Sequence, residues 1–337
     1  MSADRRIGRG GKAPAQTGHG GGKRSPLPAG FDRQFARVAY GLLILAILFF
    51  TWLHHVRPEV LRVPDPRNVS SWENPSFPHT CIHDRMTAGE RAELLAHGVP
   101  GNTLPMLAFG EIMSLLVATL CFAHVRRHYG NWMATCFLIG SFVFTGMQES
   151  IWILFGRFTG SSASQGIGEQ VFGTYWFTRG GLWFIETPVA VCLGWFVWAY
   201  AAVWIAGTAF PGMGLPGRAL LGALIPMSND IWLDPVMTSP ENLTWVWAKG
   251  DCLLLFGIPH TNFLGWFFLI FLFAIFWGQL PGWEQRWGRP RATLCFFLLL
   301  VLGELAILAF LFPWCTLLKQ GLLLAGVEHT LRLPPGW

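Results

Sequence analysis

Seven stretches of about 20 mostly apolar residues limit what this chain can fold into. They cover residues 37–54, 104–124, 131–155, 182–206, 217–236, 261–280 and 293–315. A helix of this length crosses the hydrocarbon core of a bilayer and satisfies its own backbone hydrogen bonds there. The sequence therefore predicts an all-α fold, a polytopic transmembrane helix bundle with about seven spanning helices.

The composition excludes an ordinary soluble domain. Hydrophobic residues make up 52% of the chain and charged residues 13%, whereas soluble domains carry about 25% charged residues. The net charge of +5 does not indicate nucleic acid, because eight of the 24 Lys and Arg residues lie before residue 38 and most others flank apolar stretches. We expect membrane lipids as neighbours and no nucleic-acid partner.

Charge placement predicts the topology. Residues 1–30 are basic and rich in glycine, so we expect a disordered tail, followed by a transmembrane domain over residues 31–337. With the N-terminus inside, the inner segments carry eight, two, one and three Lys or Arg, and the outer ones five, two, one and two. This bias predicts a multi-pass protein of the cell membrane with the N-terminus inside and the C-terminus outside.

Two connecting segments carry local predictions. The longest outer loop, residues 55–103, contains Thr87 followed by Glu90, a capping box that predicts a short surface helix. The apolar run 251–259 is too short to span, so we expect it at the interface or re-entering the membrane. We expect no internal repeat.

Six carboxyl side chains fall within or at the ends of the predicted helices. They are Glu111, Glu149, Glu186, Asp230, Asp234 and Glu304. An ionisable group at membrane depth is costly and by default marks a site or a buried pair. All except Glu304 fall in the outer half of their helices, which predicts a shared polar pocket near the outer membrane boundary. The alternative is a set of helix-end residues that reach the interface.

Asp230 and Asp234 form the sharpest pair. Their i, i+4 spacing places both on one helix face, one turn apart, and Pro235 is expected to end the helix. Two carboxylates this close resist ionising together, so one is expected to hold its proton and be available as a general acid. Similar pairs bind magnesium and diphosphate in prenyl-transfer sites, but this stretch lacks the basic residues that a diphosphate needs.

Aromatic residues surround the pair in sequence. Trp245, Trp247, Asn262 and Trp266 follow it, and Tyr175 and Trp176 precede the fourth predicted helix. These residues fit an aromatic belt at the membrane interface. They also fit a wall of π faces that stabilises a carbocation without attacking it. The sequence leaves both interpretations open.

The sequence contains no strong pattern for a metal or redox-cofactor site. His79, Cys81 and His83 alternate along the chain, but no partner cluster lies nearby, so we expect no metal site. Phosphate-loop, zinc-protease and haem patterns are missing, and no cofactor is expected. Seven scattered cysteines without a CxxC pair are interpreted as apolar packing residues. His54 and His55 are interpreted as interfacial residues.

Two blocks over residues 140–280 resemble the membrane carotenoid hydratases. The first contains Glu149, then Phe172-Gly173-Thr-Tyr175-Trp-Phe177-Thr178, then Pro188. The second contains Gly222-Ala-Leu-Ile-Pro-Met-Ser-Asn229-Asp230-Ile-Trp-Leu-Asp234-Pro235-Val, then Trp245-Val-Trp247, then Gly257-Ile-Pro259-His-Thr-Asn262-Phe-Leu-Gly265-Trp266. The chain departs from this pattern at Phe177, Asn229 and Glu186.

The resemblance implies hydration of a terminal trisubstituted alkene of a carotenoid, such as the ψ-end of γ-carotene or of bisanhydrobacterioruberin. Asp230, Asp234 and Glu149 are the implied catalytic residues. The expected substrate contacts are Tyr175, Trp245, Trp247, Asn262, Trp266, Glu186 and Glu111. The expected partners are a lipophilic polyene or isoprenoid from the bilayer and other pigment-pathway enzymes.

Two other classes of protein stay open. A membrane terpene or meroterpenoid cyclase begins with the same protonation but quenches the cation with an internal alkene. A non-catalytic carotenoid or lipid carrier needs the aromatic pocket but not the acids.

Overall fold

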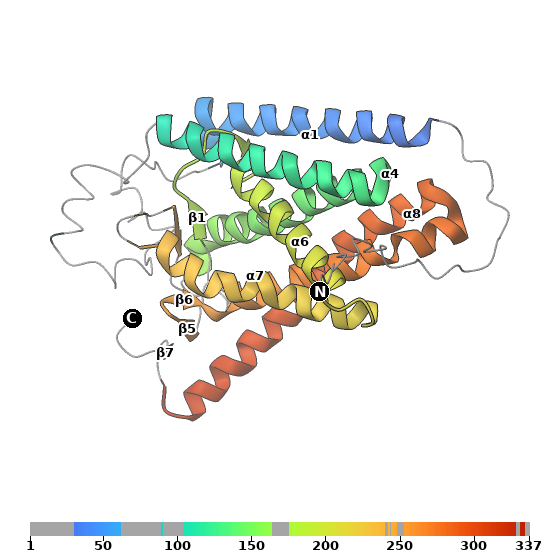
Figure 1. The fold of residues 1–337 in the computed structure, drawn as a ribbon. Helices are drawn as coiled ribbons and strands as arrows, with labels where there is room; N and C mark the ends of the chain where they lie inside the picture. Colours follow the sequence, from blue (N-terminus) through green and yellow to red (C-terminus); the bar gives the residue numbers. More distant parts are fainter. Residues whose placement is uncertain are drawn as a thin grey trace, which may run out of the picture.

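The computed structural model describes residues 30–61, 89, 104–163, 175–239, 242, 244–247, 253–327 and 331–333. The predicted disordered tail, the capping box at Thr87 and the His79–His83 stretch lie outside these residues. The described part is a bundle of long helices with short strands gathered at one end (Figure 1).

Six helices form the bundle. They are α1 (Phe31–Val56), α2 (Pro58–Leu61), α4 (Leu104–Ala163), α6 (Val189–Ala209), α7 (Leu215–Met237) and α8 (His260–Leu324). Helices α4 and α8 each reverse direction at a glycine with positive φ, Gly130 (φ 83°) and Gly288 (φ 75°). Glycine adopts such a φ without steric cost because it has no Cβ.

These reversals divide the helices other than α2 into seven segments that match the seven predicted apolar stretches. Among the described residues, α1, α4, α6 and α8 contain stretches long and apolar enough to cross a membrane. The prediction of an all-α membrane protein is therefore confirmed. The number of crossings stays a prediction.

The surface and the core both fit a lipid solvent. Large apolar side chains such as Leu42, Leu45, Phe109 and Leu120 are exposed on α1 and the first half of α4, a surface that lipid tolerates and water does not. The core contains fully buried aromatic rings, among them Phe137, Phe196, Phe273 and Phe296. Helix α4 packs mainly on α6, and α7 on α8.

The end of the bundle opposite the strands is held by Arg289, just after the reversal in α8 (Figure 1). Its guanidinium donates to Asp32 near the start of α1 and to Glu284 Oε1 (2.7 Å). It also lies over the ring of Trp132, 5.3 Å from the centroid. These contacts place the start of α1 beside the α8 reversal.

Seven short strands lie at the other end (Figure 1). Strand β1 (Tyr175–Phe177) pairs antiparallel with β4 (Trp245–Trp247). Strands β2 (Trp183–Phe184) and β3 (Thr187–Pro188) form one hairpin, and β5 (Leu253–Leu255) and β6 (Ile258–Pro259) form another, with β7 (Leu331–Leu333) parallel to β5.

The structure corrects three predictions about secondary structure. The fourth helix begins at Val189 instead of residue 182, because the segment before it folds into the β2–β3 hairpin. The described part of the 251–259 run is the β5–β6 hairpin. Helix α7 continues past Pro235 to Met237, because a proline ring disturbs the preceding turn and not the following one.

The chain also contains an internal repeat, so the expectation of none was wrong. Met147-x-x-x-Ile-Trp152 in α4 recurs as Met227-x-x-x-Ile-Trp232 in α7. Pro188 and Pro259 each end a hairpin and precede a helix that carries Leu-Gly-Trp-Phe five residues later. Both hairpin turns begin with a positive-φ apolar residue, Ile185 (φ 55°) and Phe256 (φ 53°).

The β1–β4 pair shows how the two repeats are related. Tyr175 pairs with Trp247 and Phe177 with Trp245, while Trp176 and Val246 pair at the centre. This register is what a two-fold rotation of one repeat onto the other produces, because equivalent residues exchange places about the central pair. The β1–β4 pair therefore joins the two repeats next to the site.

Candidate active site

A cavity of about 240 Å³ lies between the two repeats, next to the paired strands β1 and β4. Its apolar wall comes from α6 and α7 and from the aromatic strands. Its polar lining groups are Glu149, Asp234 and Asn262, from α4, α7 and α8. Glu149 and Asp234, two of the carboxyl side chains predicted to share a pocket, therefore line one cavity together with Asn262.

Asp230 and Asp234 are bridged by one amide. The Asn262 Nδ2 donates to Asp230 Oδ2 (2.5 Å) and to Asp234 Oδ2 (2.6 Å). Both carboxyls are buried, at 0% and 2% exposure, but only Asp234 lines the cavity. The other oxygen of Asp230, Oδ1, has no hydrogen-bond partner among the described residues. The pair is therefore a buried diacid with one member facing the cavity and one behind it.

Glu149 is held on the opposite side by a tryptophan. Trp195 Nε1 donates to Glu149 Oε1 (2.8 Å), and the Trp195 ring stacks on Trp266 with centroids 3.9 Å apart. Trp195 and Trp266 are the equivalent residues of the two Leu-Gly-Trp-Phe motifs. The stack thus joins the repeats and fixes the carboxyl at the cavity wall.

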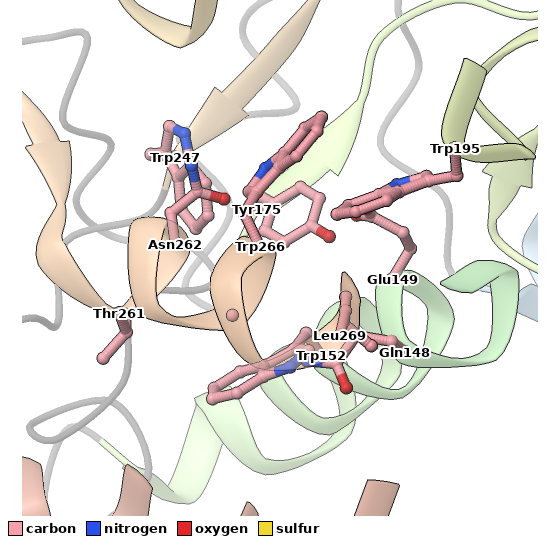
Figure 2. Close-up of a pocket in the computed structure, with 11 residues that line it drawn as sticks. Gln148, Glu149, Trp152, Tyr175, Trp195, Trp247, Thr261, Asn262, Trp266 and Leu269 are labelled. Carbon is pink, nitrogen blue, oxygen red and sulfur yellow. The ribbon is translucent and has the colours of Figure 1, made fainter. Parts of the chain in front are cut away.

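A second, smaller space of about 30 Å³ adjoins the first, and Figure 2 shows its lining. Six residues line both spaces: Glu149, Tyr175, Trp195, Trp247, Asn262 and Trp266. Gln148, Trp152 and Thr261 line only the small one. A volume of this size holds about one or two water molecules.

Behind the small space lies a buried polar chain. With its amide oriented to satisfy both neighbours, Gln148 donates to the carboxyl of Glu304 and accepts from the indole N–H of Trp152. Such amide orientations are assigned from the hydrogen-bond network. Glu304, which the sequence did not group with the others, thus supports this pocket from the second half of α8.

Four of the predicted aromatic residues line the cavity. Tyr175, Trp245, Trp247 and Trp266 all contribute to its wall, and the Tyr175 and Trp247 rings lie 4.4 Å apart. Trp247 Nε1 is buried and has no hydrogen-bond partner within the described part of the chain. This placement favours the wall of π faces over the interfacial belt.

A half-buried arginine, Arg179, connects the ends of these strands. Arg179 Nη2 donates to Thr244 Oγ1 (2.5 Å), and the Thr178 N–H donates to the Thr244 carbonyl (3.1 Å). Burial lowers the pKa of the Arg179 guanidinium from its usual value.

Two predicted substrate contacts lie elsewhere. Glu111 Oε1 accepts from the backbone N–H groups of Gly181 (2.8 Å) and Leu182 (2.6 Å), so it holds the loop before β2. Glu186 is buried in the β2–β3 turn with an oxygen 3.9 Å from His54 Nε2. Neither lines either space. Both were grouped with the site because they share its depth in the membrane.

His54, which the sequence predicted to be interfacial, packs inside the protein. It is buried against the Trp183 ring, with centroids 4.0 Å apart, and its Nε2–H donates to the Ile185 carbonyl (2.7 Å). His55 is exposed and donates to the Gly181 carbonyl (2.8 Å). Both histidines anchor the end of α1 to the loop before α6.

Sequence reasoning missed Gln148, Trp152, Trp195 and Trp198. The repeated Leu-Gly-Trp-Phe motif was the available signal for Trp195, because its equivalent, Trp266, was already a candidate. Gln148 and Trp152 lie beside Glu149 in sequence, but nothing in the sequence alone distinguishes them from packing residues.

Comparison with known proteins agrees with this geometry. No curated protein and no solved structure matches the chain. A protein family described as carotenoid biosynthesis protein matches residues 109–326, more than half of the chain. The match includes every residue that lines the two spaces. The chain therefore belongs to the carotenoid biosynthesis protein family.

Proposed function

We propose that this protein is a multi-pass enzyme of the cell membrane that adds water to a terminal trisubstituted alkene of a carotenoid. The observation that carries the proposal is the buried Asp230/Asp234 pair beside an aromatic cavity. Such a pair supplies a proton, and the aromatic faces stabilise the tertiary cation that forms.

Asp234 is the proposed proton donor because it lines the cavity and Asp230 does not. Its O–H bond breaks as the π electrons of the alkene form a C–H bond at the less substituted carbon. A water oxygen then bonds to the tertiary cation while Glu149 accepts the released proton. The proton must return from Glu149 to the pair before the next turnover. The net reaction adds one water and consumes nothing else.

The cavity dimensions fit the end of a polyene better than a whole one. A drug-sized ligand fills about 300–1,000 Å³, whereas the larger space holds about 240 Å³. Its wall includes Ala190, Gly194 and Trp198 of α6 and Leu233 and Met237 of α7, all partly exposed on the bundle. We propose that the end group enters between α6 and α7 and that the rest of the polyene stays in the bilayer.

Cyclisation is the second candidate, because it shares the protonation step. The small polar space beside Glu149 favours hydration, since an internal alkene needs no separate water site. A carrier without activity leaves the buried diacid unexplained, because burying two carboxyls costs free energy that a simple binding pocket does not require.

Expression in a bacterium that accumulates lycopene or γ-carotene, followed by pigment mass analysis, tests the proposal. A product heavier by one water supports hydration. A new isomer of unchanged mass supports cyclisation. An unchanged pigment despite inserted, folded protein contradicts both reactions for these substrates. The Asp234→Asn variant at matched expression is the control for background chemistry.

A further inference from the structure

The two glycines of the repeated Leu-Gly-Trp-Phe motif lie in different parts of the site. Gly265 lines only the space of about 30 Å³, and Gly194 lines only the space of about 240 Å³. They occupy equivalent positions, since each precedes a tryptophan of the Trp195–Trp266 stack. Equivalent positions of the two repeats thus line a small compartment in one case and a large one in the other.

Neither glycine is needed for close packing. A Cβ added at either position would meet no other atom within 4 Å. Gly265 is nevertheless buried, so the open space beside it is an internal one, the small compartment itself. Glycine is a poor residue for a helix interior, and both positions lie within helices. Because these two glycines have no Cβ, the compartments beside them keep their volume.

The two compartments differ in the groups around them. The small one adds Gln148, Trp152 and Thr261 to the shared residues, and these carry amide, indole N–H and hydroxyl groups. The large one adds mainly apolar groups, among them Phe177, Val191 and Leu233, along with Asp234. A water molecule suits the first compartment and an alkene end group the second, and Glu149 lies at the boundary of both.

We infer that Gly265 keeps open a water compartment that decides whether the cation ends as an alcohol, and that Gly194 keeps open the alkene compartment. This inference rests on the proposed hydration. A methyl group at position 265 fills the space that holds water, and the cation then loses to Glu149 a proton from the carbon that was protonated and returns to the starting alkene. A methyl group at position 194 narrows the place of the end group.

Matched Gly265→Ala and Gly194→Ala variants test the inference. Both substitutions place alanine, the best helix former, within a helix, so folding should be retained. The purified full-length protein is placed in lipid nanodiscs in D₂O with a linear carotene that carries a terminal trisubstituted alkene. Two products are measured by mass: the alcohol, and recovered carotene that has gained deuterium through reversible protonation.

For Gly265→Ala we expect at least a tenfold fall in alcohol while deuterium exchange into carotene persists or rises. For Gly194→Ala we expect both products to fall together, with a raised KM and an unchanged ratio of alcohol to exchange. Wild-type alcohol yield from Gly265→Ala, or an equal loss of alcohol and exchange, would overturn the inference. A wild-type protein that makes neither product overturns the proposed hydration instead, before the variants are compared.

Discussion

At the residue scale, the site depends on one amide that serves two acids. Asn262 donates one N–H to each aspartate from the first turn of α8, which begins directly after Pro259. Buried carboxyls without a cation between them are costly as a pair of anions. A proton kept on the pair removes one of those charges, and this proton is the one proposed to reach the alkene.

Asp234→Asn should lower turnover by at least 10²–10⁴-fold, the usual contribution of general acid catalysis. Asparagine keeps the size and an oxygen acceptor for Asn262, but it cannot protonate carbon. Asp230→Asn should lower turnover less, because Asp230 lies behind the cavity. Activity per folded molecule is the measurement. Near-normal activity per folded molecule in both variants would show that the pair takes no part in the mechanism. A loss of total activity that only follows the loss of folded protein would show that the pair supports folding instead.

Glu111 should matter for stability and not for chemistry. Glu111→Ala removes the acceptor of two backbone N–H groups, and each lost hydrogen bond to a charged group costs about 1.5–3 kcal/mol. The loss of unfolding free energy should be smaller than this sum, because Glu111 is partly exposed and water can replace part of the lost hydrogen bonding. A lower melting temperature in detergent with unchanged specific activity is expected, and Glu111→Gln should recover most of the stability. A changed KM of Glu111→Ala with normal stability would instead show that Glu111 contacts the substrate.

At the element scale, two hairpins position the two site helices. Their turns place Ile185 and Phe256 at positive φ, where a non-glycine residue costs about 1–3 kcal/mol. Contacts around the first turn compensate for this, including the hydrogen bond from His54 to the Ile185 carbonyl and the Ser150 hydroxyl that accepts from the Glu186 N–H (3.1 Å). The hairpins thus start α6 and α8 at matching points on either side of the cavity.

The reversals in α4 and α8, unlike the two hairpin turns, have glycine at the positive-φ position. Gly130 has φ 83° and ψ 169°, a conformation that is essentially restricted to glycine. A Cβ there would meet no atom within 4 Å, so Gly130→Ala should destabilise the fold by about 1–3 kcal/mol through the backbone alone. Thermal unfolding in detergent measures this.

Gly110→Ala is the matched control for this prediction, because Gly110 lies within the same helix and also has open space around it. It should stabilise slightly, since alanine is about 1 kcal/mol better than glycine in a helix. Equal effects at the two positions would show that the reversal does not require positive φ.

At the scale of the whole molecule, an approximately symmetric scaffold carries an asymmetric set of reactive groups. In the aligned repeats, Glu149 corresponds to Asn229, Ser150 to Asp230 and Leu154 to Asp234. Asn262 corresponds to Val191. Tyr175, Phe177 and Trp195 correspond to Trp245, Trp247 and Trp266, so these positions are aromatic in both halves, whereas each half supplies different acids. The proposed proton donor, Asp234, therefore comes from the second repeat and the proposed proton acceptor, Glu149, from the first, and both line one cavity.

Seven helical segments that each cross the membrane place the two ends of the chain on opposite sides, with the N-terminus inside and the C-terminus outside. A reporter fused after Trp337 should be active only outside the cell. The same reporter inserted in the connection between α6 and α7, residues 210–214, should be active only inside. Activity of both fusions on one side would contradict the topology.

The sequence by itself determined the class of fold. Apolar stretches of spanning length permit helices and little else in a bilayer, because backbone groups must pair within their own segment. It also identified the aspartate pair, since i, i+4 spacing on one helix fixes two side chains on one face. The apolar stretch 261–280 placed Asn262 at the start of a helix, and α8 does begin at His260.

Only the tertiary structure decided which residues meet. Depth in the membrane grouped Glu111 and Glu186 with Glu149, but depth does not determine which side chains meet. Glu111 binds the loop before β2 and Glu186 lies in the β2–β3 turn, so neither lines the cavity. The stack of Trp195 on Trp266 joins residues 71 positions apart along the chain. No local pattern encodes that contact, because it arises from two repeats packing face to face.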